Sequence, residues 1–90
     1  IKDVTLPTFM SDVVQASLKV PVLLYFTASW CGPCKQLGPT LNKLVEKAAG
    51  KVQLARVDID KNQQIAAQFG VQSVPTVYAF VQGQPVDAFQ

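Results

Sequence analysis

Two cysteines separated by two residues, Cys31 and Cys34, are the part of this sequence best suited to carry chemistry. They lie in the stretch WCGPCK at residues 30–35, which also holds the single tryptophan of the chain. Two thiols at this spacing can close a small disulfide ring, and a thiolate is both nucleophile and leaving group in disulfide exchange. The pattern therefore predicts reversible two-electron chemistry between a dithiol and a disulfide.

The residues alone leave other uses of the pair open. It could be a buried structural disulfide or two inert core thiols. Zinc requires four ligands, and a chain with two cysteines and no histidine would need a second chain to complete such a site. Haem attachment requires a histidine directly after the second cysteine, where Lys35 stands. We expect no metal and no cofactor beyond a redox-active disulfide.

Composition and charge exclude several classes of function. The 90 residues, 49% of them hydrophobic, fit one domain with one core, residues 1–90. The net charge is +2 and the lysines and arginines are scattered, so no nucleic-acid partner is expected. No apolar run approaches the ~20 residues of a membrane span. One Cys-x-x-Cys indicates a catalytic pair in a cytoplasmic protein, although a first residue Ile1 leaves signal-peptide removal open.

A predicted strand and a predicted helix position the cysteine pair. Residues 20–27, VPVLLYFT, are almost continuously apolar, which is typical of a central strand covered on both faces. Residues 32–49 predict a long helix that ends at Gly50, with a kink at Pro39. Its expected apolar face consists of Leu37, Leu41, Leu44, Val45 and Ala48.

The segments around this unit predict an α/β fold. Residues 1–5 fit an edge strand, and Thr8 is expected to cap a first helix that carries Phe9, Val13 and Leu18. Residues 52–57 form a second internal strand, and a short helix stops at Gly70. Residues 76–81 and 86–89 form a C-terminal antiparallel hairpin. This order implies a central mixed sheet with helices on both faces.

The place of Cys31 at the start of the long helix sets its expected reactivity. Unpaired N–H groups in the first turn carry partial positive charge, and Lys35 adds a full charge about one turn on. The pKa of Cys31 is therefore expected below the free-thiol value of about 8.5. Cys34 lies deeper in the helix, so we assign Cys31 as the accessible nucleophile and Cys34 as the resolving thiol. Gly32 permits close approach of a substrate backbone, and Pro33 fixes φ at the helix start.

These residues resemble the thioredoxin family over nearly the whole chain. The resemblance is carried by the WCGPCK stretch, Pro39, the sequence DID at residues 58–60 and the sequence VPT at residues 74–76. It implies a thioredoxin fold and a protein-disulfide reductase that contributes to redox homeostasis. Its partners would be proteins with disulfides or free thiols and an external reductant of the thioredoxin reductase type.

Two positions have a different meaning with and without the resemblance. From the residues alone, Val74-Pro75 is an ordinary turn with a trans bond, and a lone tryptophan is a core residue. The resemblance implies instead that the bond before Pro75 is cis and that the backbone of Val74 pairs with a substrate strand beside Cys31. It also favours Trp30 as part of an apolar docking patch with Pro33 and Val74.

The sequence departs from the family pattern at Tyr25. Thioredoxins usually place a buried aspartate here, which is thought to accept the proton of the resolving thiol. A tyrosine hydroxyl is a poor base at neutral pH, so Cys34 is expected to resolve slowly unless water or another carboxylate substitutes. Arg56 matches the lysine beside that aspartate and is expected to keep a positive charge without its carboxylate partner. Thr27 replaces a common aromatic residue.

Residues 21–26, 65–70 and 83–90 resemble one branch more narrowly, the bacterial chaperedoxins, in which tetratricopeptide-type helices follow a thioredoxin-like domain. This resemblance implies an alternative function, a redox-linked holdase that binds unfolding clients and passes them to chaperones with little turnover. Because the chain ends at Gln90, before the last helix of a thioredoxin domain, we expect a piece of a longer protein. Asp58 and Asp60 are expected to form a solvated turn rather than a cation site.

Overall fold

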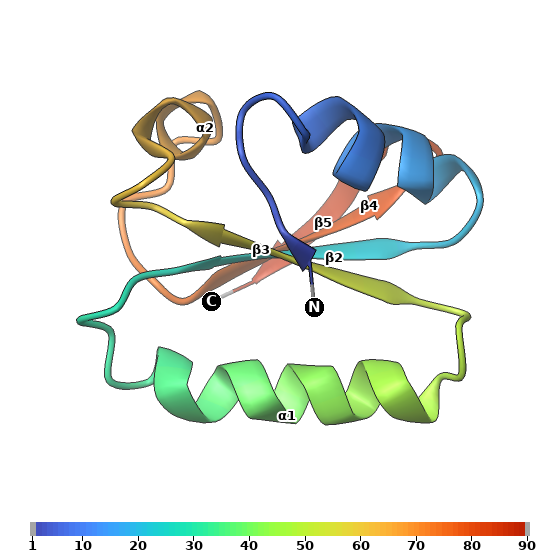
Figure 1. Ribbon diagram of the computed structural model, residues 1–90, viewed down its shortest axis with the longest axis horizontal. Coiled ribbons are helices and arrows are strands. Elements are labelled where there is room, and N and C mark those ends of the chain that lie inside the picture. Colours follow the sequence, from blue (N-terminus) through green and yellow to red (C-terminus); the bar gives the residue numbers. More distant parts are fainter. Residues whose placement is uncertain (1, 90) are drawn as a thin grey trace.

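A computed structural model describes residues 2–89 as one five-stranded sheet with strand order β1-β3-β2-β4-β5 (Figure 1). Strands β1 (Lys2–Asp3) and β2 (Val22–Thr27) run parallel to β3 (Gln53–Asp58). Strand β4 (Thr76–Val81) is antiparallel to β2, and β5 (Gln84–Phe89) is antiparallel to β4. The predicted mixed sheet, its edge strand and its C-terminal hairpin are confirmed.

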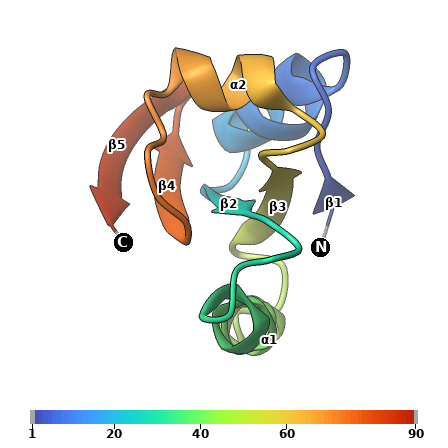
Figure 2. The same ribbon diagram turned by 90° about the vertical axis from the view of Figure 1, so that its left-hand side faces the viewer.

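Helices cover both faces of the sheet, as expected. Helix α1 (Cys34–Lys47) lies alone against one face, and α2 (Gln63–Gln68) lies with two short helical segments on the other (Figures 1 and 2). These segments are the π-helix η1 (Met10–Gln15) and the 3-10 turn η2 (Ala16–Leu18). Strand β2 is central and buried between the two helical layers, so the cysteine pair follows the most enclosed strand.

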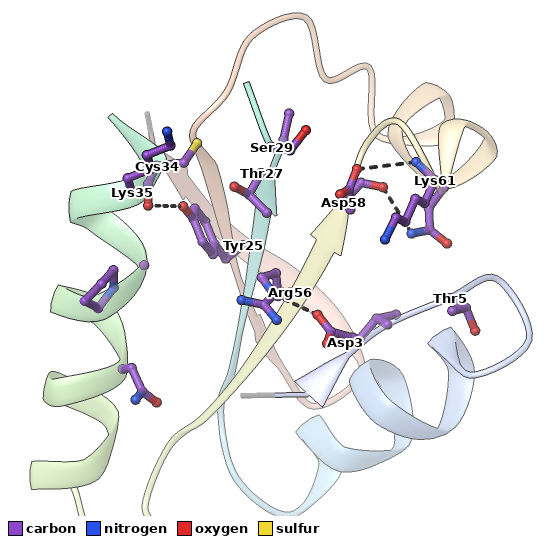
Figure 3. A pocket seen from close by; sticks show the side chains of 16 residues that line it. Asp3, Thr5, Tyr25, Thr27, Ser29, Cys34, Lys35, Arg56, Asp58 and Lys61 are labelled. Carbon is purple, nitrogen blue, oxygen red and sulfur yellow. Dashed lines mark hydrogen bonds and ion pairs between the residues drawn. The ribbon is translucent and has the colours of Figure 1, made fainter. Parts of the chain in front are cut away.

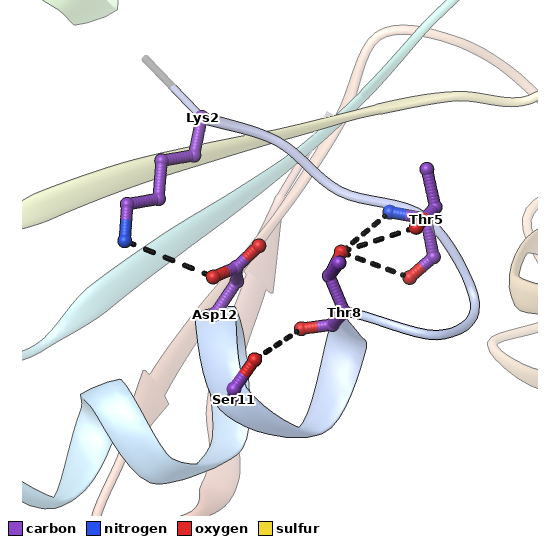
Figure 4. A network of polar contacts seen from close by, with 5 residues as sticks. All are labelled: Lys2, Thr5, Thr8, Ser11 and Asp12. Carbon is purple, nitrogen blue, oxygen red and sulfur yellow. Dashed lines mark hydrogen bonds and ion pairs between the residues drawn. The ribbon is translucent and has the colours of Figure 1, made fainter.

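The first helix differs from the prediction. Thr8 does not cap it, because the Thr8 hydroxyl accepts a hydrogen bond from the backbone N–H of Thr5 at 3.0 Å (Figure 4). Val13 is buried as expected, but Leu18 is 54% exposed. The π-helix and the 3-10 turn change the angular spacing of side chains, so Ser17 turns inward instead. Its hydroxyl accepts a hydrogen bond from the backbone N–H of Gly83 at 2.8 Å.

Helix α1 begins at Cys34 and continues through Pro39 to Lys47 (Figure 1). Its buried residues are Cys34, Gly38 and Leu41, so the buried face is centred on the cysteine end of the predicted apolar stripe. Leu44 lies on the margin of that face and is 57% exposed, contrary to the prediction. The N-terminal half of α1 is therefore the part of the helix that is buried most against the sheet.

The hairpin turn between β4 and β5 has the residue types that its geometry requires. Gln82 and Gly83 both have positive φ, 54° and 81°, as in the two-residue turns that match strand twist. Every residue of β5 is exposed, including Val86 and Phe89. None of the helices formed by residues 2–89 is long and apolar enough to cross a membrane.

Candidate active site

Cys31 and Cys34 are joined by a disulfide at the start of α1, with their Cα atoms 5.3 Å apart. The backbone N–H of Cys34 donates a hydrogen bond to Sγ of Cys31 at 3.2 Å. This N–H is one of the groups at a helix start that have no partner within the helix. A thiolate at Cys31 would therefore be stabilised by this hydrogen bond and by the partial positive charge at the N-terminus of α1.

Contrary to the prediction, Cys31 and Cys34 have almost the same exposed fraction. Cys31 is 3% exposed and Cys34 is 5% exposed, so the prediction that Cys31 is the more accessible does not hold for this disulfide form. The bond draws both sulfurs into one apolar cluster that includes Ala28 and Val77. What distinguishes them is their place in the chain, because Cys31 precedes the helix beside exposed residues whereas Cys34 belongs to its first buried turn.

Exposed and half-buried apolar side chains surround the disulfide. Trp30 is 66% exposed and is therefore not a core residue. Pro33 is exposed, and Val74 and Pro75 are half-buried. The bond between Val74 and Pro75 is cis, as the resemblance implied and contrary to the reading from residues alone. Val74 packs against the cluster that contains both cysteines.

Trp30 is tied to the turn after β3, a contact that the sequence analysis missed. Its Nε1–H donates a hydrogen bond to Oδ2 of Asp60 at 2.9 Å. Asp58 shapes the same turn, because its Oδ1 accepts the backbone N–H groups of Asp60 at 2.9 Å and Lys61 at 3.4 Å. Among residues 2–89, no group of three or more His, Cys, Asp or Glu side chains could hold a metal ion.

Tyr25 lies under the first turn of α1 and is buried. Its hydroxyl donates a hydrogen bond to the backbone carbonyl of Cys34 at 3.0 Å (Figure 3). The ring passes close to Gly38, where an added Cβ would meet Cε2 at 3.6 Å and the hydroxyl oxygen at 3.7 Å. Tyr25 therefore supports the helix backbone at Cys34, a role that no sequence pattern indicated.

Arg56 has a carboxylate partner after all. Its Nε donates to Oδ1 of Asp3 at 2.7 Å, which lowers the pKa of Asp3 and raises the pKa of Arg56 (Figure 3). The carboxylate that the family places at position 25 is absent, as expected, but Asp3 is a partner that was not foreseen, because β1 pairs with β3 and Asp3 lies directly beside Arg56 in that register. A two-residue strand gave no signal of this pairing.

A groove of about 760 Å³ runs between α1 and the β1–β3 side of the sheet (Figure 3). Lys35, which is exposed, contributes its charged side chain to the wall of this groove. The other lining residues that matter for the site are Tyr25, Thr27, Cys34, Arg56 and Asp58. Cys34 therefore borders a groove that also holds polar and charged side chains.

Comparisons with known proteins agree with this geometry. The family model described as Thioredoxin matches residues 1–90. Mitochondrial thioredoxin of Mus musculus is 48% identical over 83 residues, which cover 92% of this chain and 49% of the relative. Thioredoxin of Haemophilus influenzae is 46% identical over 78 residues, covering 87% of this chain and 71% of the relative.

A solved structure, Fasciola hepatica thioredoxin, matches with a TM-score of 0.89 and 27% identity, covering 99% of this chain and 85% of that one. The chain spans about half the length of the mitochondrial relatives it matches, 49%, and 77% of thioredoxin 1 of Nostoc, to which it is 40% identical over 84 residues.

Proposed function

The chain belongs to the thioredoxin family, and on that premise we propose that it is a protein-disulfide oxidoreductase with Cys31 and Cys34 as its catalytic pair. The observation that carries the proposal is the Cys31–Cys34 disulfide at the start of α1, with the backbone N–H of Cys34 directed at Sγ of Cys31. A reactive pair at such a position can cycle between dithiol and disulfide without a cofactor.

In the proposed cycle, the Cys31 thiolate attacks one sulfur of a substrate disulfide and expels the other as a thiolate. Cys34, as a thiolate, then attacks Sγ of Cys31 and expels the second substrate sulfur. The substrate has gained two electrons and the domain has lost two, which leaves the disulfide seen here. A reductant of the thioredoxin reductase type would return the electrons.

Protein substrates would dock on the apolar surface around the disulfide. Trp30 and Pro33 are exposed next to the cysteines in the chain, and half-buried Val74 packs against the cluster that contains both cysteines. Gly32 has nothing within 4 Å of the position that a Cβ would occupy, so a substrate backbone can approach there. The hydrogen bond to Asp60 fixes the orientation of the exposed Trp30 ring.

The narrower resemblance to chaperedoxins gains no support from the comparisons, whose relatives named above are thioredoxins. A client-holding function, with chaperones as partners, is therefore an outcome to be tested rather than a second proposal. The relatives include mitochondrial and bacterial proteins, so a cytoplasmic location also stays a prediction.

An insulin-reduction assay with a thioredoxin reductase tests the proposed function. We expect steady turnover by the native chain, none by Cys31→Ser, and an accumulated mixed disulfide with Cys34→Ser. Asp87→Asn, on exposed strand β5, is the control that should match the native chain. Turnover by Cys31→Ser, or retention of unfolded clients by the native chain without any turnover, would contradict the proposal.

A further inference from the structure

Resolution of the mixed disulfide needs a group that accepts the proton of Cys34, and Tyr25 is badly suited to this. The Tyr25 hydroxyl donates its hydrogen to the carbonyl of Cys34 at 3.0 Å. A neutral phenol is also a weak base at neutral pH. The proton acceptor therefore has to come from another side of Cys34.

The groove beside α1 brings two carboxylates toward this side, those of Asp3 and Asp58. Asp3 is engaged by Arg56 at 2.7 Å, and this hydrogen bond lowers the pKa of Asp3, which makes it a poor proton acceptor. Asp58 uses only Oδ1 in its turn. Its Oδ2 accepts no hydrogen bond from any residue between 2 and 89 and is free to take a proton.

The register of the sheet places Thr27 beside Asp58. The two residues are direct partners in the parallel pairing of β2 with β3, two residues along from the Tyr25 and Arg56 pair. Residues two apart in a strand share a face, so Thr27 faces α1 as Tyr25 does. Figure 3 shows Thr27 in the groove between Cys34 and Asp58. Its hydroxyl can both accept and donate a proton.

We propose that Asp58 is the proton acceptor for Cys34 during resolution, and that the Thr27 hydroxyl and groove solvent connect the two. This inference rests on the proposed function. The proton passes from Sγ of Cys34 to the carboxylate of Asp58, and the sulfur electron pair forms the bond to Sγ of Cys31. The bond between Cys31 and the substrate sulfur breaks, and the departing thiolate takes up the proton. No further oxidant or reductant is required.

Charged and titratable groups from each surrounding element act on this path. Arg56 and Lys61 carry positive charges and line the same groove as Asp58, and Lys35 adds a positive charge from α1. The full set around the groove is Asp3 of β1, Tyr25 of β2, Cys34 and Lys35 of α1, Arg56 and Asp58 of β3, and Lys61 of the following turn. Helix α2 contributes no titratable side chain to it.

Reaction of the reduced chain with dithiobis(nitrobenzoate) tests the proposal by stopped-flow absorbance. The attack of Cys31 releases one coloured thiolate, and the attack of Cys34 on the mixed disulfide releases a second. We expect Asp58→Asn to slow only the second phase, by about tenfold at neutral pH. The deficit should shrink toward pH 9, because a free thiol ionises without an acceptor near about 8.5. Asp58→Glu should restore the native profile.

The variant is designed to keep the turn intact, since an amide oxygen can accept the same backbone N–H groups as Oδ1 of Asp58. Asp87→Asn makes the same charge change on exposed β5 and should leave both phases unchanged. An unchanged second phase, or a deficit of the same size at every pH, would overturn the role of Asp58. If Asp58→Asn does not fold, Thr27→Val is measured instead. A pH-dependent slowing of its second phase would support the proton path, and an unchanged second phase would refute it.

Loss of the first phase in the native chain would instead refute the proposed function. The two phases therefore separate a failure of the catalytic pair from a failure of the proton path.

Discussion

The two faces of the sheet are built for different purposes. The face under α2 is closed by aromatic rings at tilted or edge-on angles, with centroids 5.5 Å apart for Phe26 and Phe69 and 5.0 Å apart for Phe69 and Tyr78. The face under α1 holds the disulfide, a buried tyrosine and a groove of about 760 Å³ with an arginine and two aspartates. The first face is closed mainly by aromatic packing, whereas the second combines an apolar cluster with a groove that holds charged groups.

Strand β2 supplies both faces by simple alternation. Phe26 points to the aromatic cluster and Tyr25, next to it in the chain, points to the cysteine pair. The difference teaches that this small domain concentrates its packing on one side, so that the other side can keep polar groups beside a reactive disulfide. We expect substitutions on the first face to change stability and substitutions on the second to change chemistry.

The largest effect on stability is expected from Phe26→Ala. Removing this buried ring leaves a cavity in the aromatic cluster, which typically costs about 3–5 kcal/mol. The urea midpoint measures this loss, while the rate of Cys31 attack in the folded fraction should stay within about twofold of native. Phe89→Ala, on exposed β5, is the matched control. A decrease of less than about 1 kcal/mol in the unfolding free energy of Phe26→Ala would contradict the view that this face supplies most of the stability.

Tyr25→Asp should have mixed effects. It removes the ring that packs on Gly38 and leaves a buried carboxylate, so we expect a loss of about 2–4 kcal/mol in unfolding free energy. Near Cys34 the new carboxylate should speed the second phase of the thiol reaction, and it should do so even when Asp58→Asn is also present. Equal resolution rates with and without the substitution would show that a buried base is unnecessary here.

Tyr25→Phe and Tyr78→Phe form a matched pair across the sheet. Each removes one hydroxyl that donates to a backbone carbonyl at 3.0 Å, that of Cys34 or that of Phe69. Both should lower the unfolding free energy by about 1 kcal/mol. Only Tyr25→Phe should change the rate of resolution, because only it alters the backbone that carries Cys34. Equal kinetic effects of both would remove the distinction between the faces.

The smallest effect is expected from Asp3→Asn at the edge of the polar face. Both partners of the Arg56 ion pair are substantially exposed, so the pair contributes about 0.2–1 kcal/mol. The pKa of Asp3 is lowered in the folded chain, first by the hydrogen bond from Arg56. The contribution should therefore be present above the unfolded value of about 3.9 and disappear as the pH falls through the folded pKa. Urea titrations of both chains at neutral and acidic pH measure this.

Errors in the sequence-based predictions occurred where contacts are long-range or helices are irregular. Leu18 was placed inside by regular spacing, but the π-helix and the 3-10 turn carry it outward. The pairing of Arg56 with Asp3 was missed because the predicted edge strand does not by itself indicate which strand it pairs with. The bond between Trp30 and Asp60 joins positions thirty residues apart in the chain, beyond the reach of any local pattern.

The sequence by itself determined the order of strands and helices, the hairpin and the cysteine pair at a helix start. These follow from local preferences, namely apolar periodicity, turn residues and the spacing of two thiols. Only the tertiary structure decided the contact of Tyr25 with the Cys34 carbonyl, the hydrogen bond from Trp30 to Asp60 and the groove shared by Cys34 and Asp58. These features depend on strand register and helix docking, which bring together residues that local preferences leave independent.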